Sequence, residues 1–451
     1  MKKQKFLHHK LMNIKKILYF LAAFILMMYG CTAAQTGDPV FSWDNSQTPE
    51  WNIARNAIAL DSCTQWDFLD EILRGKRVLI IGEQGHADRT TVSVRAHMLH
   101  ELKELGFETV LFEVAPFIPV SENALLKESI SHDQWESTLD LQPCYHMHEF
   151  RPAIEMIKNG EITIAGMDIL VDDSVVDTIQ AILEKNYETS PDFLVDWDRL
   201  KELQHKLNPG KSYAFGSMLS FAEEQEYMNT LNQIRNETDR LIRHIGKNRE
   251  LSAVRQWLRN MDRNYALTHS FSTEVNTISA YFNQTRDRMM AENVMWYVEH
   301  FPDEKFVVWC ANFHGNKDIS QTIYRPDNNC YYIFNLMGEQ LYNRLGNELY
   351  SMAFTSLNQR YPDYYTQEMI NYIQAENCGK MAADYPPGEL ERTIGTVTND
   401  APFAFVDFER LRDKEGYRDV LFEMSAIYKK HGQWLNMYDG LYYIRDMEAF
   451  H

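Results

Sequence analysis

The stretch VLIIGEQGHADRT, residues 78–90, decides the fold, because it joins a short apolar run directly to a turn with charged side chains. Four consecutive apolar residues predict a buried strand, and Gly82 and Gly85 then allow a sharp change of chain direction. The turn also carries Glu83 and His86. Ligands bind at the carboxyl ends of strands in open α/β sheets, so these two side chains predict a functional edge.

A helical pattern over residues 90–105 follows the turn, with Gly106 just beyond it as a stop signal. Similar alternation in residues 50–190 and 303–451 predicts an α/β hydrolase-like core with a mostly parallel central sheet and flanking helices. Residues 191–302 show helical spacing and predict a large helical insertion that covers the carboxyl edge of the strands. The predicted strands are residues 77–81, 109–112, 162–166, 306–310, 331–336, 349–355 and 403–406.

The first 31 residues have the pattern of a secretory signal: six lysines, an apolar run at residues 17–29, then Gly30 and Cys31. The apolar run is shorter than the roughly 20 residues of a membrane span, although a simple membrane-anchoring helix is the alternative. A small residue before the cysteine resembles a bacterial lipoprotein signal, which predicts lipidation of Cys31 and a location on the periplasmic side of a membrane. Tyr29 departs from that pattern and leaves ordinary cleavage nearby as a further alternative. Residues 32–49 read as a linker.

The charge of the chain argues against nucleic acid as a partner. The formal net charge is −19, and it becomes −25 without residues 1–31, which contain six lysines and no acidic residue. A surface this acidic repels phosphate backbones. Five cysteines remain after residue 31, with no C-x-x-C pair, so the sequence indicates neither a disulfide framework nor a zinc ribbon.

Polar side chains also follow other predicted strands. Glu113 ends the run TVLFE, Asp168 ends ITIAGMD, and Asn312 and His314 end FVVWCANFH. The carboxyl ends of neighbouring parallel strands share one edge of the sheet, so these side chains are expected to meet Glu83 and His86 there. Buried charged groups are costly unless they are paired or used.

Each of these residues has a chemical role in this interpretation. His86 is the natural general base, because an imidazole titrates near neutral pH and a carboxylate such as Glu83 or Glu113 can orient it. Arg95, two to three turns along the following helix, could hold a carboxylate or stabilise an oxyanion. The alternatives are helix capping for Glu83 and Asp168, and a solvated surface position for Arg95. His314 could equally be an ordinary loop histidine.

The absence of other motifs narrows the chemistry. The sequence contains no G-x-S-x-G elbow, no H-E-x-x-H pair and no phosphate-binding glycine loop. What remains is activation of water by a histidine–carboxylate site, with or without a metal ion.

Several blocks together resemble the erythromycin esterase-like family, which includes macrolide esterases and succinoglycan biosynthesis-type proteins. They are IGEQGHADRTTVSVRAHMLHELKELGFETVLFEV, RPAIEMIKNGEITIAGMDI, TRDRMMAENVMWYV, FVVWCANFHGN, NRLGNELYSMAF, APFAFVDF and YDGLYYIRD, and they occur in family order over roughly residues 50–450. The resemblance implies a hydrolase in which His86 activates water. Around the substrate carbonyl it implies the residues Glu83, Glu113, Arg95 and His314. From their places at strand ends, we also expect Asp168 and Asn312 to bind the substrate.

One position departs from the family pattern A-H-N-x-H. This chain reads Cys310-Ala311-Asn312-Phe313-His314, so Ala311 replaces the first histidine. Loss of one such contact typically costs about 2–4 kcal/mol of transition-state stabilisation. His146 or His148 could substitute for the missing imidazole in space.

Three functions follow from these observations. The first is a hydrolase of esters or lactones, without a cofactor, that could contribute to inactivation of macrolide antibiotics. The second is a metal-dependent hydrolase with Glu83, His86, Glu113 and His314 as ligands. The third is a catalytically inactive lipoprotein that binds an amphipathic small molecule.

Overall fold

Eight strands of the described part of the chain form one sheet in the order β1-β7-β10-β6-β2-β5-β3-β4. The computed structural model describes residues 42–85, 88–113, 148–169, 171, 173–186, 193–207, 219–246, 248–270, 275–321, 335–360, 387–425 and 430–448. The predictions for the signal segment with Cys31, most of the linker, His86 and His146 fall outside these residues. All that follows concerns the compact unit that begins at Asp44.

The central strands run parallel, as the sequence predicted. β10 pairs with β6, β6 with β2, β2 with β5, β5 with β3 and β3 with β4, all in parallel, whereas β7 pairs with β10 and β1 with β7 in antiparallel fashion. The strands are β1 (Ile58–Leu60), β2 (Val78–Ile81), β3 (Thr109–Phe112), β4 (Thr163–Gly166), β5 (Phe306–Trp309), β6 (Leu349–Arg360), β7 (Phe403–Asp407) and β10 (Gly440–Glu448). The fold is therefore α/β with a mostly parallel sheet.

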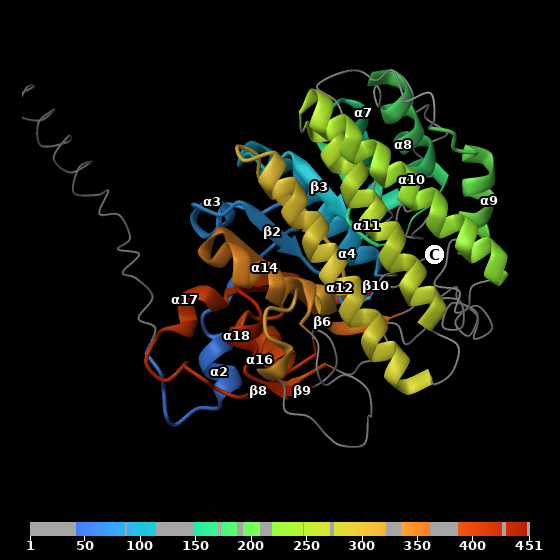
Figure 1. Cartoon of the computed structure of the whole chain (residues 1–451). Helices are drawn as coiled ribbons and strands as arrows, with labels where there is room; N and C mark the ends of the chain where they lie inside the picture. Colours follow the sequence, from blue (N-terminus) through green and yellow to red (C-terminus); the bar gives the residue numbers. More distant parts are fainter. Residues whose placement is uncertain are drawn as a thin grey trace, which may run out of the picture. The chain divides into compact units, whose positions relative to one another are not determined.

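Both faces of the sheet are covered, because successive side chains of a strand point to opposite faces. In β2, Val78 and Ile80 belong to one apolar core, and Leu79 and Ile81 belong to the other. The first core includes side chains of α8 (Asp173–Asn186), α9 (Trp197–Leu207), α10 (Phe221–Ile245), α11 (Arg249–Ser270) and α12 (Val275–His300). The second includes α4 (Arg89–Glu104) and α7 (Arg151–Lys158). Figure 1 shows α10, α11 and α12 side by side as one layer.

The remaining elements are short and lie mostly in the C-terminal third. They are α2 (Pro49–Ala54), α3 (Leu69–Ile72), η2 (His148–Phe150), α13 (Asn312–Gly315), η3 (Ile319–Gln321), α14 (Met337–Leu345), η4 (Gly346–Glu348), α16 (Glu389–Val397), α17 (Phe408–Arg412), α18 (Trp434–Met437) and the antiparallel pair β8 (Phe422–Met424) and β9 (Lys430–Gly432). No helix among the described residues is both long and apolar enough to cross a membrane.

The predicted strand at residues 331–336 has no counterpart where it can be checked. Residues 331–334 lie outside the described part, and Leu336 is the N-cap of α14 rather than part of a strand. The other six predicted strands are present, with ends shifted by one residue at most except for β6, which continues to Arg360.

Candidate functional site

The carboxyl ends of β2, β5, β3 and β4 bring the predicted side chains to one edge of the sheet. These four strands are consecutive neighbours and run in parallel, so the residues that follow each of them emerge on the same side. Glu83 follows β2, Glu113 follows β3, Asp168 follows β4, and His314 lies in α13 after β5. All four are buried.

Glu83 and Arg95 form a buried ion pair that joins the turn after β2 to α4. Arg95 is fully buried, and its guanidinium carbon lies 3.9 Å from the ring centre of Trp309 at the end of β5. The alternative of a solvated surface arginine is therefore wrong. Asp88, not Glu83, is the N-cap residue of α4, so Glu83 does not cap that helix. Arg95 is placed to fix the carboxylate of Glu83 at the edge of the sheet.

Arg286 of α12 connects the other three predicted residues. Its Nε lies 3.0 Å and its Nη2 2.7 Å from oxygens of Asp168, and Nη2 also donates to Glu113 Oε1 at 2.5 Å. Nη1 lies 3.0 Å from His314 Nε2. Such fork-shaped pairing fixes carboxylates in direction as well as distance. Together with Asp287, these residues form what we call the Arg286 cluster.

His314 is held between two carboxylates in this cluster. Its Nδ1 lies 2.9 Å from Asp287 Oδ1, and its Nε2 lies 3.4 Å from Glu113 Oε1. Burial alone would lower the pKa of His314, but Asp287 and Glu113 outweigh burial and raise this pKa to about 10. Arg286 opposes protonation of Nε2 from 3.0 Å, yet its charge is shared with Glu113 and Asp168. Because a guanidinium N–H can only donate, the contact of Nη1 with Nε2 favours an unprotonated Nε2 and acts against the two carboxylates.

Sequence reasoning missed Arg286 and Asp287 as members of the site, although it quoted the segment that contains them. Asp287 is fully buried, and its Oδ1 also accepts a hydrogen bond from the Met337 backbone at the start of α14. The available signal was a run of charges of alternating sign, Arg286 to Arg288, directly before the apolar residues Met289 to Ala291. Buried charges are rarely found without a partner or a function.

Asn312 connects strands at the same edge. Its side-chain amide donates to the Phe354 carbonyl oxygen at 2.7 Å and accepts from the Phe354 amide at 3.0 Å, while its backbone N–H donates to the Glu83 carbonyl oxygen at 2.8 Å. A Cβ atom at Gly82 would lie 2.0 Å from Asn312 Oδ1, which explains the glycine at this point. Asn312 thus anchors the turn after β2; its predicted contact with a substrate stays a prediction.

Ala311, which departs from the family pattern, takes part in the site through its backbone N–H. The Ala311 N–H donates to Glu113 Oε2 at 3.1 Å, so it orients the carboxylate that also binds Arg286. His148, one of the two histidines considered as a substitute, is exposed in η2, which packs against α4. His146 and His86 lie outside the described residues.

The described donors do not fit a metal site. Among the residues whose placement is described, no three His, Cys, Asp or Glu side chains are arranged to hold a metal ion. Glu113 and Glu83, two ligands of the metal-dependent alternative, are each bound to a buried arginine instead. A guanidinium already supplies the positive charge that a divalent cation would bring.

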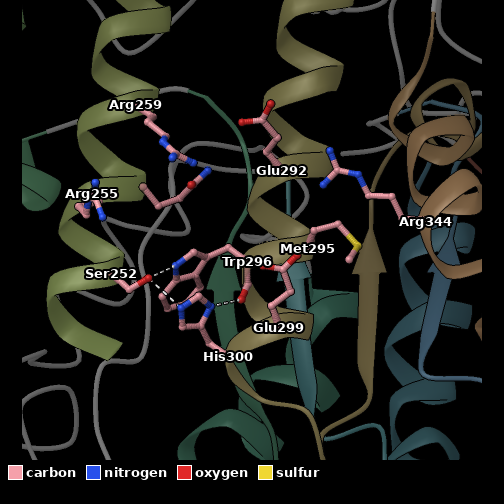
Figure 2. A pocket seen from close by; sticks show the side chains of 10 residues that line it. Ser252, Arg255, Arg259, Glu292, Met295, Trp296, Glu299, His300 and Arg344 are labelled. Atoms are coloured by element: carbon pink, nitrogen blue, oxygen red, sulfur yellow. Dashed lines mark hydrogen bonds between the residues drawn. The ribbon is translucent and has the colours of Figure 1, made fainter. Parts of the chain in front are cut away.

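A surface pocket of about 350 Å³ lies elsewhere, between α11, α12 and α14 (Figure 2). Trp296 Nε1 donates to Ser252 Oγ at 3.1 Å, and Ser252 Oγ lies 2.7 Å from His300 Nε2. Trp296 is ten residues beyond Arg286 on α12, about 15 Å along the helix axis. The pocket contains none of the predicted site residues. The hydrogen bonds among Trp296, Ser252 and His300 in its lining link α11 to α12.

Comparison with solved structures shows the same fold. A crystal structure of a Bacillus cereus protein has a TM-score of 0.63 and 17% identity, covering 91% of this chain and 99% of that chain. A succinoglycan biosynthesis protein has a TM-score of 0.59 and 16% identity over 91% and 100% of the two chains. A mutant erythromycin esterase in its open conformation has a TM-score of 0.53 and 13% identity over 88% and 98%.

Sequence comparison adds the family. The putative hydrolase YbfO of Bacillus subtilis (strain 168) is 21% identical over an alignment of 430 positions that covers 86% of this chain and 86% of that protein. The sequence profile described as erythromycin esterase matches residues 126–445 and so includes Asp168, Arg286 and His314, although it begins beyond the turn after β2. The matched segment is well over half of the sequence, and it points to hydrolase chemistry: the chain belongs to the erythromycin esterase family.

Proposed function

We propose that the protein hydrolyses an ester or lactone of a small molecule, with His86 as the base that activates water. The observation that carries this proposal is the Arg286 cluster at the carboxyl edge of the sheet. Each buried ion costs several kcal/mol of desolvation. A group of buried charged side chains at a ligand-binding edge, one of them a histidine with a raised pKa, is typical of active sites.

In the proposed reaction, water attacks the carbonyl carbon while His86 accepts its proton. The carbonyl π electrons move to the oxygen and form an oxyanion in a tetrahedral intermediate. When the carbon–oxygen bond to the leaving group breaks, the alkoxide takes up a proton and the acid product is released. A positive charge near the oxyanion lowers the barrier, and contacts of this type are worth about 2.7–4 kcal/mol each.

The described residues suit the supporting roles of this reaction. In its protonated form His314 can donate a proton to the alkoxide, and Asp287 fixes the orientation of the imidazole through Nδ1. Arg286 binds Glu113 Oε1, and the same oxygen lies 3.4 Å from His314 Nε2. Glu83 and Arg95 stabilise the turn that precedes His86.

Replacement of His86 by alanine tests the proposal. With a panel of esters and lactones that includes macrolides, we expect turnover that adds one water, read by mass, and at least a 100-fold loss of rate in His86→Ala, in line with the size of general-base effects. His97→Ala is the matched control, because His97 lies on α4 and its Nδ1 is 2.7 Å from the Ser93 carbonyl oxygen, away from the cluster.

Three outcomes separate the candidate functions. Turnover that resists EDTA and is lost in His86→Ala supports the proposal. Turnover that EDTA abolishes and Mn²⁺ or Zn²⁺ restores favours the metal-dependent alternative. Ligand binding without turnover, unchanged in His86→Ala, favours the binding protein.

Ala311→His should raise the rate of lactone hydrolysis by about tenfold or more, if the family imidazole contributes a contact of the usual strength. The backbone N–H of residue 311 already faces Glu113, so the substitution adds a side chain beside an oriented carboxylate. The rate constants of the two proteins on the same lactone measure the effect. Ala311→Gln, which adds bulk without an imidazole, is the control, and a rate in Ala311→His at or below wild type contradicts the expectation.

A further inference from the structure

Three sets of contacts hold the turn after β2, and the proposed reaction gives no role to the third of them. Arg95 binds the carboxylate of Glu83, and Asn312 binds the Glu83 carbonyl oxygen. The next side chain, Gln84, points towards the C-terminal part of the fold. Its Oε1 accepts from Ser356 Oγ of β6 at 3.1 Å, and its Nε2 donates to the carbonyl oxygen of Ser425.

Ser425, whose carbonyl oxygen accepts the hydrogen bond from Gln84, is itself held by a hydrogen bond. The Ser425 N–H donates to Glu391 Oε1 of α16 at 2.9 Å, and Thr355 Oγ1 of β6 donates to the same oxygen at 2.6 Å. Ser425 and Glu391 are both fully buried. A Cβ atom at Gly388 would lie 2.7 Å from Glu391 Oε2, so the chain leaves room for this carboxyl group.

Glu391 has no described cation beside it. No ion pair to Glu391 occurs within the described ranges, and burial raises the pKa of its carboxyl group. A buried carboxyl without a counter-charge is costly, so a compensating role is expected. The contacts show such a role: Glu391 accepts a hydrogen bond from the backbone of Ser425, the residue that binds Gln84.

We infer that Gln84 is a positioning residue, which ties the turn carrying Glu83 and His86 to β6 and, through Ser425, to Glu391. The inference rests on the proposed function for its kinetic consequence. Gln84 lies next to Glu83 and two residues before His86 in the chain. A shift of about 1 Å in a reacting group can lower a rate about 100-fold.

Two measurements on the full chain test the inference. In Gln84→Ala, kcat on the ester or lactone found in the panel should fall about 10- to 100-fold, with KM within about threefold of wild type, because the turn moves while the substrate surface stays. Hydrogen–deuterium exchange should become faster in the peptide that spans residues 78–90 and stay unchanged in α10. Gln84→Glu should lose as much rate, because it sets a carboxylate against the Ser425 carbonyl oxygen.

Matched variants exclude a general structural effect. Ser356→Ala should reproduce part of the loss and Ser356→Thr, which keeps the hydroxyl, should restore the rate. Gln180→Ala is the control, because Gln180 pairs with Glu184 on α8, far from the turn in sequence. An unchanged kcat in Gln84→Ala, or a loss matched by an equal loss in Gln180→Ala, overturns the inference.

The exchange measurement separates this inference from the proposed function. If wild-type protein shows no turnover, the proposed function fails, and exchange alone then decides the role of Gln84. Unchanged exchange at residues 78–90 in Gln84→Ala rejects the positioning role. Faster exchange confined to that peptide supports it.

Discussion

Arg286→Met is expected to lower kcat/KM at least 100-fold and to destabilise the fold by about 3–5 kcal/mol, the usual result of breaking a buried ion pair from one side. Arg286 binds Asp168 through two nitrogens and Glu113 through one. Without the guanidinium, two buried carboxylates lose their counter-charge, and one of them must take up a proton or move. Rates on the panel substrate and urea unfolding measure the two effects.

A conservative variant at position 286 and a control at another arginine make this test more specific. Arg286→Lys keeps the charge but loses the fork that reaches three partners, so we expect a rate between those of Arg286→Met and wild type. Arg259→Ala is the control, because Arg259 is exposed and lines the surface pocket between α11 and α12. Wild-type stability and rate in Arg286→Met would contradict the assignment of Arg286 to the site.

His314 should make the stability of the protein depend on pH between about 6.5 and 10. Its pKa is 6.5 without the fold and about 10 within it, because Asp287 and Glu113 outweigh burial. A group whose pKa is higher in the folded state contributes stability that is fully present below the unfolded pKa and is lost as pH rises through the folded pKa. One pKa unit corresponds to about 1.4 kcal/mol, so the stabilisation is at most on the order of 5 kcal/mol, and the opposing charge of Arg286, 3.0 Å from Nε2, lowers it.

Comparison with a variant that lacks the imidazole at position 314 measures this effect. Between about pH 6 and pH 10, the free energy of unfolding should fall further in wild type than in His314→Asn, and the extra fall measures the stabilisation that His314 contributes. Asp287→Asn should weaken the dependence, since it removes the carboxylate nearest to Nδ1. His431→Gln, at an exposed histidine, should leave it unchanged. Parallel pH curves for wild type and His314→Asn would show that His314 titrates as in the unfolded chain.

The strand-end residues could be predicted because their placement follows from local sequence. A buried apolar run followed by glycine and a carboxylate fixes both the strand and the side from which Glu83 emerges. The same reasoning located Glu113, Asp168 and His314, since parallel neighbours share an edge. That prediction assumed that the strands are parallel neighbours, and the strand order agrees with the assumption.

Arg286 and Asp287 could not be predicted in the same way. A helical pattern tells which residues share a face of a helix, but not which end of that helix reaches the edge of the sheet. α12 is 26 residues long, and only its register against β3, β4 and β5 brings Arg286 to Glu113 and Asp168. The link from Gln84 to Ser425 depends on the C-terminal segment in the same manner, since 341 positions separate the two residues.

β10 shows a limit of strand patterns. It lies inside the sheet between β7 and β6, yet it was absent from the strands predicted by pattern and was implied only by the family resemblance of its segment. Its residues Gly440 to Ile444 are buried on both faces, so they lack the polar–apolar alternation of a half-exposed strand. The run Leu441 to Ile444 is compatible with a buried strand, but periodicity alone does not distinguish such a run from a buried helix segment.

The close approach of Asn312 to Gly82 restricts how this protein can be engineered. Any larger residue at Gly82 would collide with the carboxamide that holds Phe354, so variation there disrupts two strands at once. A library aimed at new substrates should therefore leave that glycine invariant and vary Ala311, whose side chain is small and only partly enclosed. Under the proposed function, position 311 is therefore open to substitution, whereas the close approach of Asn312 leaves room only for glycine at position 82.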